Sequence, residues 1–357
     1  MTRLAILENG GTPTDRWSIR ASSLDGVDFA QEAAAIFGAI AANAVVAFEI
    51  GVNARGDFVD ARAGLPDPVI IEQYSRMKYG DLDAVSFFAR QLADRAMQSE
   101  RFLAHVRDAA TAKRVVYITT AAVFNVPSAS NLLLRATAAH LNILLTRQEL
   151  APVVVTELTR LSDNSLGYES TAVRERRDNL AAGRGVTIVP AYFHNECVIY
   201  LDDLFSTGYS IWRAKHRLQN VGVASSFYLL AARMDPQAVG ASQGQIEDRL
   251  NDYFVSETLQ SFAPLLRGGH FAVVQKLVRA LLDPLHTNEL PAFLAGIQTP
   301  AILKLYAAAA SDGFSRRSQG RYLPSLLALE MVLQERGVLD AAGHITGTSR
   351  DLAALYR

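Results

Sequence analysis

Short apolar segments alternate with helical segments through the middle of this sequence, and this alternation limits the folds that it can adopt. The apolar segments have the length and the β-branched and aromatic content of buried strands: RVVYITT (114–120), PVVVTEL (152–158), GVTIVPA (185–191), CVIYLDD (197–203) and SSFYLLAA (225–232). Helices are predicted between them at 128–145, after a Ser-rich cap, and at 207–222. Strands joined by helical crossovers predict an α/β fold, with a mostly parallel central sheet and flanking helices. In such sheets, ligands bind beyond the carboxyl ends of the strands.

The two ends of the chain differ from this middle part. Strands are predicted at 3–10 and 45–52 and a helix at 29–42, before a turn-rich segment at 53–68. We expect residues 1–82 to form an N-terminal adaptor or hood. A helix predicted within 83–106 begins an α/β core that spans 83–245. Residues 246–357 contain helix-like segments, which predicts a helical C-terminal domain.

Composition excludes several classes of protein. The 35 Lys and Arg residues balance 36 Asp and Glu, which argues against a surface that coats nucleic acid. The apolar stretch at 33–48 contains Asn43 and is shorter than the roughly 20 residues that span a bilayer. The single cysteine, Cys197, excludes internal disulfides and fits a reducing compartment. We therefore expect a cytoplasmic protein with no nucleic-acid or membrane partner.

The segment VIYLDDLFSTGYS (198–210) carries the clearest chemical signal. Two adjacent carboxylates at the end of an apolar strand resist being ionised together, so a cation or a polyhydroxyl ligand would stabilise them. The loop after them offers hydroxyls and, around Gly208, backbone amides at a helix start, where the dipole favours an anion. This arrangement suits a sugar phosphate, or Mg²⁺ that bridges the carboxylates to a diphosphate. The structural alternative is a solvated strand end followed by an ordinary helix-start turn.

This segment resembles the signature of type I phosphoribosyltransferases: four apolar residues, two acidic residues, a short loop, then Thr-Gly and a hydroxyl residue. Those enzymes use 5-phosphoribosyl 1-pyrophosphate (PRPP) as ribosyl donor. The resemblance implies that Asp202 and Asp203 face the ribose 2- and 3-hydroxyls and Mg²⁺. It also implies a loop for the 5-phosphate, made of Ser206, Thr207, Gly208, Tyr209 and Ser210. Tyr209 departs from the family, which usually has a small residue there; its side chain either points outward or shapes the acceptor pocket.

Further stretches are interpreted through the same resemblance. The family binds pyrophosphate with the loop after the first sheet strand, a place that is held here by Thr119, Thr120, Ala121, Ala122 and Val123. The charged segment 160–185 is long for a connection, which predicts a lid that excludes water. Its Arg174, Arg176 and Arg177 would meet pyrophosphate oxygens, and Arg174 and Arg177 are our catalytic candidates. An ordinary strand–helix turn and a solvated helix face are the structural alternatives for these two segments.

The stretch SRMKYGD (75–81) supplies two hood candidates, Arg76 and Lys78, for contact with a diphosphate or an acceptor. Together with GVASSFYLLAARMDP (222–236), it resembles a branch of phosphoribosyltransferases found in bacterial stress and tellurite-resistance-type gene clusters. On this resemblance we also expect a homodimer.

The predicted reaction is displacement of pyrophosphate from C1 of PRPP by a nitrogen or other nucleophile, promoted chiefly by orientation and electrostatics. The flanking segments do not specify the acceptor. Two alternatives stay open: a PRPP-sensing regulator without turnover, and a diphosphokinase that forms PRPP. Diphosphokinases of that kind pair two similar α/β halves, whereas this sequence has one. The histidines show no metal-ligand spacing, so we interpret each as structural.

Overall fold

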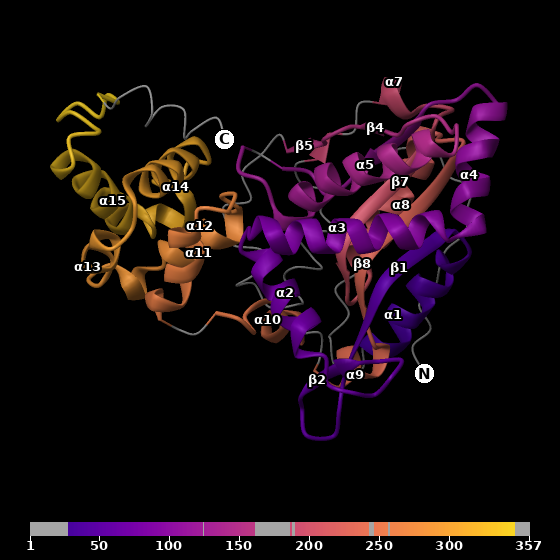
Figure 1. Cartoon of the computed structure of the whole chain (residues 1–357), viewed down its shortest axis with the longest axis horizontal. Coiled ribbons are helices and arrows are strands. Elements are labelled where there is room, and N and C mark those ends of the chain that lie inside the picture. Colours follow the sequence, from indigo (N-terminus) through magenta and orange to yellow (C-terminus); the bar gives the residue numbers. More distant parts are fainter. Residues whose placement is uncertain are drawn as a thin grey trace.

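The computed structural model describes residues 28–123, 125–160, 186–187, 190–242, 246–255 and 258–346. Its centre is a six-stranded sheet in the order β2-β1-β8-β7-β3-β4 (Figure 1). Neighbouring strands are parallel except for β2, which pairs antiparallel with β1. The strands are β1 Ala44–Val52, β2 Phe58–Asp60, β3 Val116–Thr119, β4 Val154–Val155, β7 Cys197–Phe205 and β8 Ser225–Met234. The predicted α/β fold with a mostly parallel sheet is therefore confirmed.

β7 is the central strand of the site. It is buried along its whole length and pairs with β8 on one side and β3 on the other. Ile199 and Leu201 contribute to one apolar core, while Val198 and Tyr200 contribute to another. Burial on both faces is typical of parallel strands that are covered by helices. It explains why the apolar run before the acidic pair is continuous rather than alternating.

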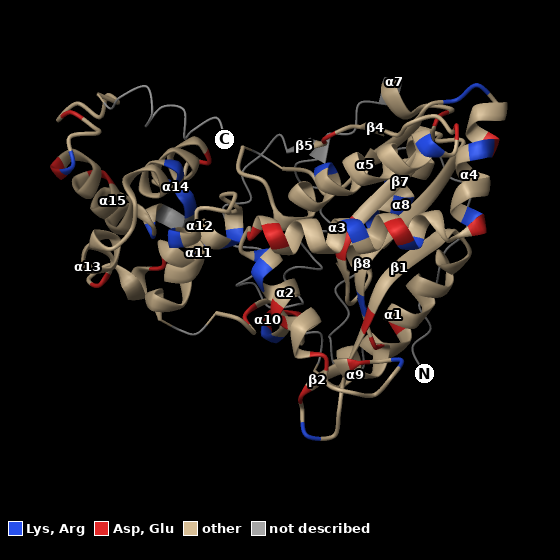
Figure 2. Cartoon of the chain, in the orientation of Figure 1, with Lys and Arg blue, Asp and Glu red and all other residues tan. Residues whose placement is uncertain are grey.

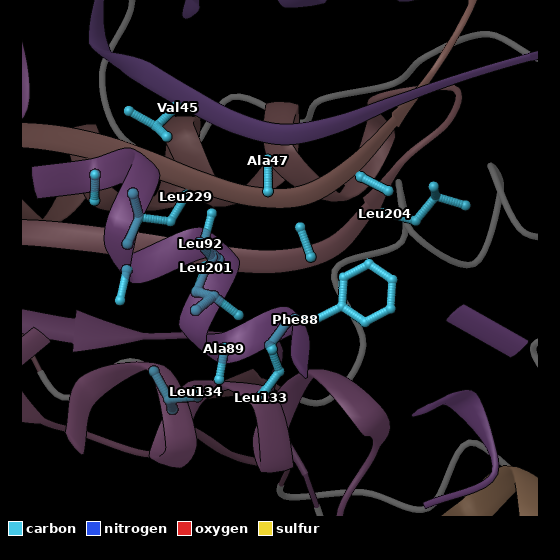
Figure 3. Packing of buried hydrophobic residues seen from close by; sticks show 14 of the residues in the cluster. Val45, Ala47, Phe88, Ala89, Leu92, Leu133, Leu134, Leu201, Leu204 and Leu229 are labelled. Carbon is cyan, nitrogen blue, oxygen red and sulfur yellow. The ribbon is translucent and has the colours of Figure 1, made fainter. Parts of the chain in front are cut away.

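Helices cover both faces of the sheet. α3 lies between the strands and α5, and Figure 3 shows Leu92 of α3 beside Leu201 and Leu229 of the sheet. The apolar residues of α3 recur at helical spacing, so one face of the helix is buried. α1 and α8 contribute to the core on the other face. The helix bounds are α1 Phe29–Gly38, α3 Leu82–Met97, α4 Glu100–Thr111, α5 Ala129–Arg147 and α8 Tyr209–Val221.

Two helices from distant parts of the sequence pack together next to the sheet. They are α2 (Pro68–Lys78) and α10 (Ile246–Asn251), and the Ser75 hydroxyl of α2 donates to the Asn251 carbonyl at 2.6 Å. No helix was predicted at 69–78: the turn-rich segment was placed at 53–68, and the stretch 75–81 was interpreted only as a source of hood residues. The start of α2 nevertheless carries a helix signal, since Asp67 caps the helix and Pro68 follows it.

The C-terminal helices form an apolar core of their own, which also includes Tyr79 (Figure 1). They are α11 Ala263–Gly268, α12 Gln275–Leu281, α13 Leu290–Ala295, α14 Thr299–Ser311 and α15 Leu323–Glu335. The predicted helical character of this region is confirmed. The domain limits of 1–82, 83–245 and 246–357 stay predictions.

Some local predictions were wrong. Val186–Thr187, within the strand predicted at 185–191, forms β6 and pairs antiparallel with β5 (Thr159–Arg160) in a separate two-stranded sheet. A short helix, α7 (Pro190–Phe193), follows, where a proline could not donate to a strand ladder. The helix predicted within 83–106 is two helices, because Ser99 caps a new helix, α4. The strand predicted at 3–10 lies outside the described residues.

Charges of both signs are interspersed over the described elements, for example along α3 and α4 (Figure 2). None of the helices in the described part of the chain combines the length and the apolar character that crossing a bilayer requires.

Candidate functional site

The acidic pair lies inside β7. We expected Asp202 and Asp203 to emerge from the sheet, but the strand continues to Phe205 and both aspartates are buried. The reason is β8, whose ladder with β7 extends as far as the pairing of Phe205 with Arg233. The backbone N–H of Asp203 donates to Asp202 Oδ1 at 3.1 Å. The two carboxyl groups are thus held near the carboxyl end of a rigid central strand.

Lys78, at the end of α2, reaches this pair. Its Nζ donates to Asp203 Oδ2 at 2.6 Å, and the two side chains are 13% and 10% exposed. Tyr74 lies one turn earlier on the same helix, with its ring centroid 5.9 Å from Lys78 Nζ. The Tyr74 hydroxyl is buried and has no hydrogen-bond partner among the described residues. α2 therefore brings a cation and a phenol to the acidic pair.

Burial and charge–charge interactions shift the pKa values of these groups. Burial, and then the Asp203 carboxylate, raise the pKa of Asp202 well above its usual value, although Lys78 opposes the shift. Burial lowers the pKa of Lys78, but Asp203, Tyr74 and Glu247 together outweigh it, so that the pKa stands well above its usual value. Burial, and then Asp203, raise the pKa of Tyr74. Lys78 is therefore charged and Tyr74 neutral near pH 7, while Asp202 holds its proton more firmly than an exposed aspartate.

The loop after β7 leads directly into α8. The Ser206 hydroxyl donates to Glu247 Oε2 of α10 at 2.8 Å. Gly208 caps α8 with a φ of 79°, and a Cβ atom there would lie 2.6 Å from Phe205 Cζ and 2.9 Å from Ile36 Cγ2. Only glycine fits this conformation and this space. The first turn of α8 has no side-chain cap, so its backbone amides keep their capacity to bind an anion.

Tyr209 is held by α1. Its hydroxyl donates to the Glu32 carboxylate, and Phe37 of α1 packs against Phe205 in an edge-to-face contact with centroids 5.4 Å apart. The bulky residue at this position of the motif therefore joins the loop 206–210 to α1, rather than pointing into solvent. Ser210, by contrast, is exposed.

The loop after β3 contains buried hydroxyls. Thr119 Oγ1 and Thr120 Oγ1 are buried, and neither has a hydrogen-bond partner within the described residues. The Ala121 carbonyl accepts from the Asn131 side chain at 3.2 Å, the Val123 N–H donates to the Leu158 carbonyl at 3.0 Å, and Ala122 is buried. Buried hydroxyls without partners are uncommon in folded proteins. Their place at the carboxyl end of a parallel strand is where such sheets bind ligands.

Arg76, the other hood candidate, does not contact the acidic pair as Lys78 does. Its guanidinium pairs with Glu72 at 2.8 Å and with Asp81 at 3.5 Å, and lies over the Phe254 ring at 4.0 Å from the centroid. These contacts connect α2 to neighbouring segments and do not involve the acidic pair. The predicted lid arginines lie outside the described residues: Arg174, Arg176 and Arg177.

Sequence reasoning missed Tyr74 and Glu247. Tyr74 precedes Lys78 by four residues, so recognising α2 as a helix would have placed both on one face. Glu247 reaches the site because α10 packs on α2, and no local pattern indicates this.

Carboxylates, an ammonium group and a phenol thus surround the end of β7, next to a helix start. Among the described residues, no group of three or more His, Cys, Asp or Glu side chains is arranged to hold a metal. Mg²⁺, however, is commonly bound by one or two carboxylates together with substrate phosphates. The oxygen donors of Asp202 and Asp203 fit an ion that arrives with a phosphorylated ligand.

The sequence matches the protein family described as PRTase ComF-like over residues 64–322. The matched region runs from before α2 to Tyr322, so it includes the acidic pair, the loop after β3 and most of the C-terminal helices. No curated protein matches the sequence.

Proposed function

The chain belongs to the phosphoribosyltransferase family described as ComF-like, and from this premise we propose that it binds PRPP and transfers its phosphoribosyl group to a nitrogen or other nucleophile. The observation that carries the proposal is the buried pair Asp202 and Asp203 next to the α8 start, which has no side-chain cap. Carboxylates accept hydrogen bonds from sugar hydroxyls, and helix-start amides bind phosphate. The carboxylates therefore suit the hydroxyls of a ribose 5-phosphate, and the helix-start amides suit its phosphate.

Each part of the donor has a counterpart in the chain. Asp202 and Asp203 accept hydrogen bonds from the ribose 2- and 3-hydroxyls, and the amides of 206–210 hold the 5-phosphate. Thr119 and Thr120 offer buried hydroxyls to the pyrophosphate. When a ribose hydroxyl binds the Asp203 carboxylate, it displaces the Lys78 ammonium, which then binds a pyrophosphate oxygen. Arg174 and Arg177 remain our candidates for closing over the leaving group.

Mg²⁺ would be held by Asp202 and Asp203 together with the oxygens of the donor, and it supplies positive charge against the charge that develops on the leaving pyrophosphate. The residues of the chain mainly orient the ribose, so their contribution is positional and electrostatic. Ionisation of Asp202 is required for metal contact, and its raised pKa makes this step depend on pH. A homodimeric state and a cytoplasmic location stay predictions.

A PRPP-binding regulator without turnover is the second candidate. Two groups that we assign to PRPP have protein partners instead: Asp203 is paired with Lys78, and Ser206 donates to Glu247. A ligand must displace both contacts, and Glu247 places a negative charge near the 5-phosphate loop. These features favour a site in which binding and release are coupled to movement of α2 and α10.

Calorimetric titration with PRPP, with and without Mg²⁺, tests the shared part of both candidates. We expect Mg²⁺-dependent binding at about micromolar affinity, which the variant Asp202→Asn/Asp203→Asn loses. Asp235→Asn is a matched control, because Asp235 follows the neighbouring strand β8 but caps α9 (Pro236–Ala241) rather than contacting the acidic pair. Wild-type affinity in the double variant would contradict the site. Release of pyrophosphate with a panel of acceptors then separates the transferase from the silent regulator.

A further inference from the structure

Asp312, at the end of α14, is a buried carboxylate far from the acidic pair in sequence. Its residue is 1% exposed, and its Oδ1 accepts the backbone N–H groups of Asn125 and Val126, both at 2.9 Å. Its Oδ2 accepts from Gln275 Nε2 and from Arg317 Nη2, both at 3.2 Å. A carboxylate is costly to bury unless it is paired and hydrogen-bonded, and here both oxygens are engaged.

These contacts join the C-terminal helices to the loop after β3. Two further bonds reinforce the connection: Asn125 Nδ2 donates to the Ser311 carbonyl at 2.5 Å, and the Gln275 N–H donates to the Pro127 carbonyl at 3.0 Å. Helices α12 and α14 therefore hold the distal part of this loop by its backbone. Backbone contacts fix the path of the chain more directly than side-chain packing does.

The same loop begins at the buried hydroxyls of Thr119 and Thr120. β3 fixes its first residue, while Asp312 fixes residues 125 and 126, a few positions later. A loop whose two ends are held has few conformations for the residues between them. Asn131 and the Leu158 carbonyl hold Ala121 and Val123, and Asp312 adds the hold on the residues that follow them.

We propose that Asp312 is a positioning residue for the pyrophosphate: through their hold on residues 125 and 126, the C-terminal helices help to keep residues 119–123 in the conformation that takes this group. The inference rests on the proposed function, and it gives the helical region a role in that site. Asp312 touches no substrate; it acts through the amides of Asn125 and Val126. Losing it loosens the loop after β3 and leaves the 5-phosphate loop after β7 unchanged.

The test measures the two ends of the donor separately, by titration with Mg²⁺·pyrophosphate and with ribose 5-phosphate. Asp312→Asn/Arg317→Met removes the charge-assisted bonds without leaving a buried cation. We expect about tenfold weaker pyrophosphate binding, since hydrogen bonds to a charged group are lost, with ribose 5-phosphate affinity unchanged. Equal weakening of both ligands, or of neither, would overturn the proposal. A wild-type protein that binds neither ligand would instead overturn the proposed function, and the inference with it.

A matched control exists in the same helical region, between α12 and α13 and before α15. Asp283 accepts the Leu285 N–H and pairs with Arg321 at 2.9 Å, but this pair lies at the surface. Asp283→Asn/Arg321→Met should leave the affinity for both ligands as in the wild type. If the Asp312 variant fails to fold, Gln275→Leu removes a single bond to Asp312 Oδ2 and uncovers no charge. It should weaken pyrophosphate binding alone, to a smaller extent, and unchanged pyrophosphate affinity in this folded variant would refute the positioning role.

Discussion

The ion pair between Lys78 and Asp203 allows a sharp prediction about stability. Removing one partner of a buried pair typically costs about 3–5 kcal/mol, because the other charge stays buried without compensation. The structure predicts that the two single variants lose different amounts of stability. Asp203→Asn leaves Lys78 with the charges of Asp202 and Glu247, whereas Lys78→Met leaves three carboxyl groups with no ammonium beside them.

We therefore expect Lys78→Met to lower the free energy of unfolding by about 3–5 kcal/mol and Asp203→Asn by less, on the order of 2 kcal/mol. The double variant should cost less than the sum of the two, with a coupling energy of about 1–3 kcal/mol. Asp202→Asn/Asp203→Asn also removes the partner of Lys78, so we expect it to destabilise the fold. Its loss of PRPP binding must be measured under conditions in which it stays folded.

Urea denaturation of the four proteins in this double-mutant cycle gives the coupling energy. The control is the bidentate pair of Arg135 and Glu157, whose side chains are 69% and 32% exposed. Exposed pairs contribute about 0.2–1 kcal/mol, so its coupling should be the smaller of the two. Additive effects at Lys78 and Asp203, or a coupling no larger than that of the control, would refute the argument from burial.

Three more predictions concern the acidic pair and the loop. Because the pKa of Asp202 is raised, the folded state binds more protons than the unfolded state above the usual pKa of 3.8, and its stability falls as the pH rises there. Asp202→Asn should therefore be more stable than the wild type at pH 7 but not at pH 3.5, as urea denaturation can check. Binding of Mg·PRPP should release a proton from Asp202, so the affinity should rise with pH and the calorimetric heat should depend on the buffer; equal heats in buffers of different ionisation enthalpy would contradict this. Thr207→Val should weaken ribose 5-phosphate binding roughly tenfold. Unchanged affinity in this variant would mean that the Thr207 hydroxyl does not face the phosphate. Gly208→Val is a poorer test, because its Cβ would also collide with Phe205.

The parts of the fold with strong local signals could be predicted from sequence. β7 has a continuous apolar run, and α8 both begins and ends at glycines with positive φ, Gly208 and Gly222. β2 could not be predicted, because three residues have no measurable periodicity and the strand exists through its pairing with β1. β6 was misplaced for the same reason: a short apolar run does not reveal which strand it pairs with.

In the candidate site, too, the contiguous part could be predicted from sequence, and the contacts made by tertiary packing could not. The acidic pair and the loop after it are contiguous in sequence, so their pattern could be read directly. The partner of Asp203 is 125 residues away, and the partner of Ser206 is 41 residues away. Sequence reasoning proposed Lys78 as a basic group near the site, but for contact with a ligand and not with the acidic pair. Such contacts follow from the packing of α2 and α10, which only the tertiary structure specifies.

The buried acids of this protein differ in a way that bears on their roles. Both oxygens of Asp312 have protein partners, as expected of a carboxylate that serves the fold. In contrast, burial, and then the neighbouring Asp203 carboxylate, raise the pKa of Asp202. In the described part of the chain, the hydroxyls of Tyr74, Thr119 and Thr120 also lack partners. Tyr74 lies close enough to the acidic pair for Asp203 to add to the effect of burial in raising its pKa. Thr119 ends the neighbouring strand β3, and Thr120 follows it. A fold selected for stability alone would satisfy or replace these groups. Their position at or beside the carboxyl ends of β3 and β7 therefore favours a polar ligand there over a purely structural role.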